Sequence, residues 1–250
     1  MNPTAGSAPV LAFVMAVALA LGLAAVTAAC SGGATGVGAT GGGAQPGGAG
    51  RTSGGHKGAT SAAAAVPSAA ELKSALLTEH DIGLGSEVDP KSIGGASIAG
   101  CEPLAGTLNA TMTATSGPGE HAASSGFAGG GTGPFLAEGL TSKAPNLLAA
   151  DYARTSAALR SCRSLTLTSG GTHLKFTMTP VAFGDSKNTS AARLKGSVQG
   201  FGVNGYLAME RFGPVVLSYY FIQLGGSSSQ LASTYYQQAV AKAGKVLALP

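Results

Sequence analysis

The apolar residues of this 250-residue chain are unevenly distributed. Val10 to Cys30 is an uncharged and mostly aliphatic run, whereas Ser31 to Ala65 consists chiefly of Gly, Ala, Ser and Thr. Beyond Pro67, apolar positions recur with the periods of helices and strands. A segment of small residues cannot bury enough apolar surface to offset its ordering entropy, so residues 30–66 are expected to be a flexible tether. The pattern therefore predicts one folded domain, residues 67–250.

The apolar run ends in Val26-Thr27-Ala28-Ala29-Cys30. Small residues directly before a cysteine resemble the cleavage site of bacterial lipoprotein signal peptides, in which the cysteine thiol carries diacylglycerol. We therefore expect residues 1–29 to be a signal peptide and Cys30 to hold the chain on membrane lipid. Two alternatives are an uncleaved anchor, since about twenty residues can cross a ~30 Å hydrocarbon core, and a cleaved, unlipidated protein. All three place the domain outside the cytoplasm.

Helical signals occur at three places in the predicted domain. Ser68 and Glu71 have the spacing of a capping box, and the helix that they start is expected to end at Gly83 and Gly85. Pro145 suits the first turn of a second helix, which should end near Cys162. A third helix is expected after Ser227 to Ser229, with a buried stripe formed by Leu231, Tyr235, Ala239, Ala243 and Val246.

The rest of the domain shows a period of two. One hairpin is predicted from Leu165 to Met178, and a second pairs Tyr206–Arg211 with Val215–Leu224. Val215–Leu224 is apolar on both faces and should lie centrally in the sheet. The expected fold class is α+β, an antiparallel sheet of two or more hairpins with two to three helices packed on one face.

Two segments are harder to interpret. The alternation from Leu104 to Met112 predicts a short strand, although strong β-formers are missing. The Gly-rich segment 116–133 predicts an exposed loop. Phe127 in it and Phe135 just after it would contact a partner or fold back as a lid.

Cysteine and charge usage narrow the function classes. Cys101 and Cys162 form an even pair in an oxidising compartment, which favours a disulfide. The formal net charge is only +4 and the basic residues are dispersed. Nucleic-acid binding usually needs a dense basic patch with aromatics, so no nucleic-acid partner is expected.

No pattern of an enzyme is present. The chain lacks a G-x-S-x-G elbow, an H-E-x-x-H zinc motif and a Walker phosphate loop. No Cys/His spacing indicates a metal site. We therefore expect no catalytic residue, no metal and no cofactor.

The order of parts resembles a known family. Leu72–Thr78 leads into Asp81-Ile82, a helix from Tyr152 ends in Cys162, and two hairpins and an amphipathic helix follow. This arrangement resembles the extracytoplasmic sensor domain of some mycobacterial receptor kinases and of actinobacterial lipoproteins. The resemblance implies ligand sensing or binding at the cell envelope rather than a reaction. Such domains commonly carry two disulfides around a cleft, whereas this chain has cysteines for one.

Two functions follow as hypotheses. The first is binding of a small apolar or amphipathic envelope ligand, with Tyr206, Tyr219, Tyr220 and Phe221 as its lining. The same aromatic residues can also be ordinary sheet core. The second hypothesis is a protein-interaction module that regulates an envelope kinase, transporter or cell-wall enzyme. A closed core with an exposed aromatic loop would favour this second function, and an internal pocket would favour the first.

Overall fold

The structure is a computed structural model. It describes residues 65–84, 86–88, 97–113, 116–130, 133–169, 172–184, 187–198, 200–226 and 228–249. The predicted signal peptide, Cys30 and most of the predicted tether lie outside the described residues. Among the described helices, none has the length and apolarity needed to cross a membrane.

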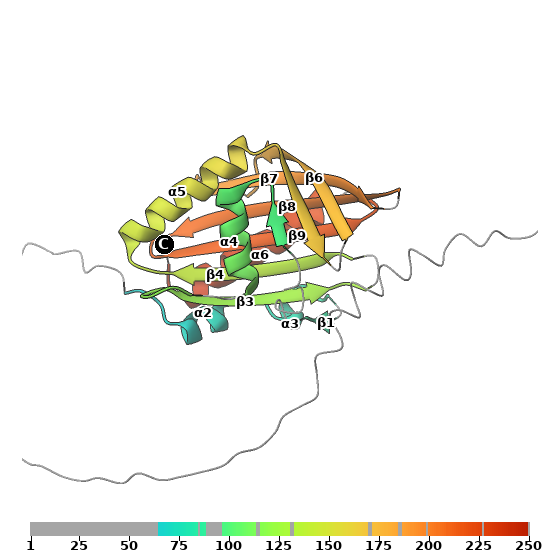
Figure 1. Ribbon diagram of the computed structural model, residues 1–250. Helices are drawn as coiled ribbons and strands as arrows, with labels where there is room; N and C mark the ends of the chain where they lie inside the picture. Colours follow the sequence, from blue (N-terminus) through green and yellow to red (C-terminus); the bar gives the residue numbers. More distant parts are fainter. Residues whose placement is uncertain are drawn as a thin grey trace, which may run out of the picture. The chain divides into compact units, whose positions relative to one another are not determined.

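The strands of the described residues form one nine-stranded sheet in the order β1-β3-β4-β9-β8-β7-β6-β5-β2, and every pairing is antiparallel (Figure 1). The strands are β1 (Ser86–Glu87), β2 (Ser97–Ala99), β3 (His121–Ala128), β4 (Phe135–Ser142), β5 (Ser164–Ser169), β6 (Thr172–Val181), β7 (Thr189–Val198), β8 (Phe201–Phe212) and β9 (Val215–Leu224). Both predicted hairpins are confirmed, as β5–β6 and β8–β9. The predicted central position of β9 is also confirmed, since it lies between β4 and β8.

Five helices of the described segments cover both faces of the sheet: α2 (Ala69–Ala75), α3 (Glu79–Ile82), α4 (Glu102–Thr113), α5 (Pro145–Ser161) and α6 (Ser229–Val246). On what we call the first face, Leu217 and Tyr219 of β9 belong to a core with α2, α3 and α6. On the second face, Val216 and Tyr220 belong to a core with α4 and α5. The α+β class is therefore confirmed, but the expectation of helices on one face only needs correction. Because β9 is apolar on both sides, each side has to be covered.

The N-terminal capping box is confirmed. The Ser68 N–H donates to Glu71 Oε2 at 2.7 Å, and the Glu71 N–H donates back to Ser68 Oγ at 3.4 Å. The expected single helix is instead two short helices, because the backbone is extended at Leu76 (φ −70°, ψ 153°). The second of them, α3, ends at Gly83, whose φ of 61° suits glycine.

Two sequence predictions are wrong. Residues 104–112 belong to helix α4 and form no strand; Leu104 and Leu108 are both buried and lie four residues apart, which also fits a helical stripe. Within segment 116–133, residues 121–128 form strand β3 and are not part of an exposed loop, and Phe127 is fully buried. Pairing with β4 along the whole of β3 supplies backbone hydrogen bonds to a segment of weak β-propensity.

The last two predicted helices are confirmed. Pro145 is the first residue of α5. The Ser228 hydroxyl caps α6 by accepting from the Leu231 N–H at 3.1 Å. Tyr235, Ala239 and Ala243 are buried as expected, whereas Val246 in the last turn is 43% exposed and does not belong to the buried stripe.

The predicted disulfide between Cys101 and Cys162 is present. Cys101 directly precedes α4, and Cys162 is the residue that ends α5. The bond therefore joins the two helices of the second face at their ends, next to the buried Leu104 and Leu159.

Removing this bond should destabilise the domain. Cys101→Ala/Cys162→Ala opens a loop with a sequence separation of 61, for which chain entropy predicts a loss of ~4 kcal/mol. Urea unfolding of the oxidised wild-type protein and of the double variant measures the difference. Equal unfolding free energies would contradict the prediction, and Ser161→Ala at an exposed neighbouring position is the control.

Candidate functional site

An aromatic cluster lies between α6 and the first face of the sheet. Phe183 stacks on Tyr206 with ring centroids 5.2 Å apart and also contacts Tyr236 at 5.0 Å. Tyr219 meets Tyr236 edge-on at 5.5 Å. Gly184 has a φ of +74°, and a Cβ there would lie 2.6 Å from a Tyr236 ring carbon, so only glycine lets the chain pass this ring.

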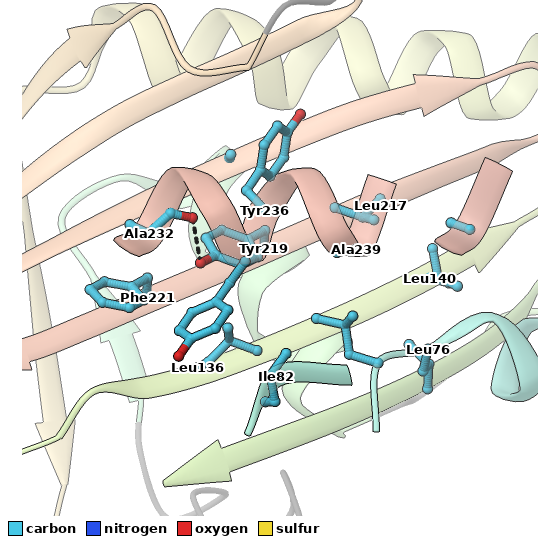
Figure 2. Packing of buried hydrophobic residues seen from close by; sticks show 14 of the residues in the cluster. Leu76, Ile82, Leu136, Leu140, Leu217, Tyr219, Phe221, Ala232, Tyr236 and Ala239 are labelled. Atoms are coloured by element: carbon cyan, nitrogen blue, oxygen red, sulfur yellow. Dashed lines mark hydrogen bonds between the residues drawn. The ribbon is translucent and has the colours of Figure 1, made fainter. Parts of the chain in front are cut away.

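The hydroxyls of Tyr219 and Tyr236 in this cluster have hydrogen-bond partners. The Tyr219 hydroxyl donates to the Ala232 carbonyl of α6 at 2.8 Å, as Figure 2 shows. The Tyr236 hydroxyl donates to the buried carboxylate of Glu210, which also accepts from Thr189 at 3.2 Å. Burial, together with the bond to Glu210, raises the pKa of Tyr236 far above its usual value. The hydroxyl therefore stays a neutral donor that holds α6 on β8.

Glu138 is a second buried carboxyl on this face. It lies opposite Tyr219 on one side and Ser125 on the other, and it has no exposed surface. Its Oε2 accepts from the Leu77 N–H at 2.9 Å, while Oε1 and the Ser125 hydroxyl have no hydrogen-bond partner. Burial raises the pKa of Glu138 to about 7, although the Leu77 N–H acts in the opposite direction.

An ion pair lies near Glu138 at the edge of the core. Lys242 of α6 donates to Asp81 of α3 at 2.6 Å, and the Thr78 N–H donates to the same oxygen at 2.7 Å. Partial burial acts to raise the pKa of Asp81, but the bonds from Lys242 and Thr78 outweigh it and lower the pKa to about 2. The pair joins helices from the two ends of the described chain.

A row of polar side chains continues the first face beyond the aromatic cluster. Arg193 of β7, Asn204 of β8 and Gln223 of β9 lie on this face, and Arg193 Nη2 donates to Asn204 Oδ1 at 3.4 Å. Arg193 Nε and Gln223 Oε1 are enclosed and have no hydrogen-bond partner. Enclosed polar atoms without partners are unfavourable, so they mark a place where a ligand or water completes the bonding.

The four aromatic residues predicted to line a site do not lie together. Tyr206, Tyr219 and Phe221 are on the first face and are at most 5% exposed, whereas Tyr220 is on the second face. Sequence reasoning missed Tyr236, Phe183 and Arg193. The alternation of side chains along a strand alone would have placed Tyr220 on the opposite face from Tyr219 and Phe221. Phe183 lies after the end of β6, where no periodic pattern indicates the direction of its side chain.

The buried carboxyl and hydroxyl groups of this face act in packing. Glu138 and Tyr219 lie side by side, but neither is exposed, so neither reaches a substrate from solvent. Within the described segments, no group of three His, Cys, Asp or Glu side chains is arranged to hold a metal ion. The side chains of the polar row at Arg193 are partly exposed to solvent.

Comparison with solved structures shows the fold. The chain is similar to the extracellular domain of PknH from Mycobacterium tuberculosis, with a TM-score of 0.53 and 14% identity over 73% of this chain and 98% of that domain. The resemblance to an extracytoplasmic sensor domain thus holds at the level of the fold. The Rv0999 ortholog from Mycobacterium smegmatis matches with a TM-score of 0.32 and 13% identity, over 63% of this chain and 84% of that one. No protein-family model matches the chain, and neither does any curated protein.

The buried carboxyl of Glu138 should make stability depend on pH. Its pKa is raised in the folded state, so folding favours the protonated form, and stability falls as the pH rises from about 4.5 to about 7. Glu138→Gln keeps an acceptor for Leu77 without a charge. Its unfolding free energy should match that of the wild type below this range and exceed it by roughly 3 kcal/mol above it.

Urea unfolding at pH 4.5 and pH 8 measures this difference. Glu102→Gln, at an exposed position of α4, serves as the control and should leave the pH dependence unchanged. A Glu138→Gln effect of the same size at both pH values would contradict the assignment.

Proposed function

We propose that this chain is a lipid-anchored, extracytoplasmic domain that binds or senses a small amphipathic envelope ligand without chemical turnover. The observation that carries the proposal is the juxtaposition on the first face of an aromatic cluster and a partly exposed polar row with unpaired atoms. Ligand sites typically combine apolar walls with a few convergent polar groups. The likeness in fold to an extracellular domain supports a place outside the cytoplasm.

The buried aromatic residues restrict where such a ligand binds. Tyr219 and Phe221 are at most 1% exposed, so they support the site from beneath. Tyr206 is 5% exposed and pairs with Arg193 across β7 and β8. The polar part of the ligand therefore meets the row of Arg193, Asn204 and Gln223, and its apolar part extends toward Tyr206.

Native mass spectrometry tests the binding function. The full chain, purified in neutral detergent from an actinobacterial host, should carry a small molecule in addition to its acyl chains and lose it on denaturation. Gln223→Ala removes an unpaired buried oxygen and should reduce the bound fraction severalfold. Gln237→Ala makes the same change at an exposed position of α6 and should leave binding intact.

A protein-interaction module is the second candidate. Phe201 is 49% exposed at the start of β8, next to the turn from β7, and the core beneath the aromatic cluster is closed. An exposed aromatic side chain at a hairpin tip suits contact with a partner protein. A bare polypeptide in the native spectrum, with no mass lost on denaturation, would favour this function over ligand binding.

The lipid anchor is tested separately. Cys30→Ala removes the thiol that would carry diacylglycerol, so the chain should leave the membrane fraction or remain unprocessed. Detergent phase partitioning and the mass of the mature N-terminus measure both effects. Normal processing with unchanged partitioning would contradict lipidation, and Thr52→Ala in the predicted tether is the control.

A further inference from the structure

The first face is not covered by helices along its whole width. The core under α2, α3 and α6 includes Val181 of β6 and Ala191 of β7, but no residue nearer the other end of these two strands. Beyond that point, side chains of the first face are exposed at Lys175, Thr177 and Lys195. This part of the sheet is therefore a solvated surface beside the aromatic cluster.

Three cationic side chains share this surface. Lys175, Thr177 and Thr179 lie two residues apart on β6 and therefore share one face, and Lys175 is paired with Thr166 of β5. On β7, Lys195 is paired with Thr177 and Arg193 with Thr179, so all three cations project from the same face. We call Lys175, Arg193 and Lys195 the cationic surface. None of the three forms an ion pair within the described part of the chain.

Among the described residues, no carboxylate lies in the register rows of Arg193 and Lys195 from β6 to β9. In the register rows of Arg193 and Lys195, the first-face positions from β6 to β9 are occupied by Thr, Tyr, Phe, Asn and Gln. Glu210, the buried acid of β8, lies four residues beyond Tyr206 and is bonded to Tyr236 and Thr189. Unbalanced cations, of which Arg193 is partly buried, attract an anion to this surface.

The unpaired atoms specify the ligand further. Arg193 Nε is a donor without an acceptor, and Gln223 Oε1 is an acceptor without a donor. Asn204 lies between them and is already engaged, since it accepts from Arg193 and donates to the Gly226 carbonyl at 2.5 Å. Strands lie ~4.8 Å apart, so β7 and β9 are about 10 Å apart. Because both atoms are enclosed, the Arg193 and Gln223 side chains have to rotate before a head group with a phosphate near β7 and a hydroxyl near β9 can bond to them.

We propose that the cationic surface binds the phosphate of an anionic amphiphile, and that a hydroxyl of the same head group donates to Gln223. This inference rests on the proposed binding function and adds the charge and chemistry of the ligand. Arg193 and the two lysines contribute charge-assisted hydrogen bonds to phosphate oxygens. The acyl part of the amphiphile extends toward Tyr206, which is the register partner of Arg193.

Native mass spectrometry of the full chain in neutral detergent tests this ligand class with defined probes. Dihexanoyl phosphatidylglycerol carries the phosphate and the hydroxyls, whereas dihexanoyl phosphatidylcholine has the same chains with a zwitterionic head. The phosphatidylglycerol adduct should be at least tenfold more abundant at equal concentration, and added salt should reduce it. Glycerol 3-phosphate, which lacks the chains, should compete weakly.

Matched variants identify the surface. Lys175→Gln/Lys195→Gln changes two exposed residues and should weaken phosphatidylglycerol binding about tenfold without unfolding the chain. Arg193→Gln should weaken it at least as much. Lys73→Gln/Lys245→Gln removes the same charge from exposed positions of α2 and α6 and should leave binding unchanged.

Three results would overturn the inference. Equal binding of both lipids, unaffected by the lysine changes, would leave the binding function standing but refute the anionic head group. Competition by glycerol 3-phosphate at the concentration of the lipid would refute the amphiphile and indicate a free phosphate ligand. Binding of neither lipid, with no mass lost on denaturation of the purified chain, would remove the binding function as well.

Discussion

The structure depends on one property of β9, which is apolar on both of its faces. A strand of this kind is stable only when both faces are shielded from water, and the antiparallel sheet around it is therefore covered by helices on two sides. The helices that cover the two faces are held in place in different ways. The second face uses two helices tied by a disulfide, whereas the first face uses helices from the two ends of the described chain.

The first face also contains polar groups that a purely apolar core would lack. Glu210 is satisfied by Tyr236 and Thr189, but Glu138 has one oxygen without a partner. A buried carboxyl is tolerated when it holds its proton or accepts enough hydrogen bonds. The polar row at Arg193 differs, because its side chains are partly exposed although its two unpaired atoms are enclosed. The same face thus combines packing with a surface suited to recognition.

Much of the fold could be predicted because local signals agreed with the tertiary structure. Ser68 and Glu71 form the predicted cap, Pro145 starts α5, and the alternation around Val215–Leu224 marks the central strand. The two segments that were predicted wrongly have ambiguous patterns of apolar residues. The spacing of Leu104 and Leu108 fits a strand and a helix equally well, and β3 is built from small residues that only pairing with β4 makes a strand.

The candidate site was less accessible to sequence reasoning. Tyr206, Tyr219 and Phe221 were predicted as lining residues, but the aromatic residues Phe183 and Tyr236 that pack beside them come from other parts of the chain. The polar row depends on the register of three strands, which places Arg193, Asn204 and Gln223 on one face. The spacing of residues along the chain does not predict that register, because the register depends on how β7 pairs with β8 and β8 with β9.

The ion pair between Asp81 and Lys242 joins positions 161 residues apart and closes the first face with elements from both ends of the domain. Such non-local contacts form late, since a long loop must close before they contribute. The second face needs only residues up to β9, so it is complete when β9 emerges during synthesis or export. The first face has to wait for α6. Until then the N-terminal helices can pack only on the sheet, through contacts such as the bond from Leu77 to Glu138. The order in which the chain is delivered therefore decides which half of the core is completed first.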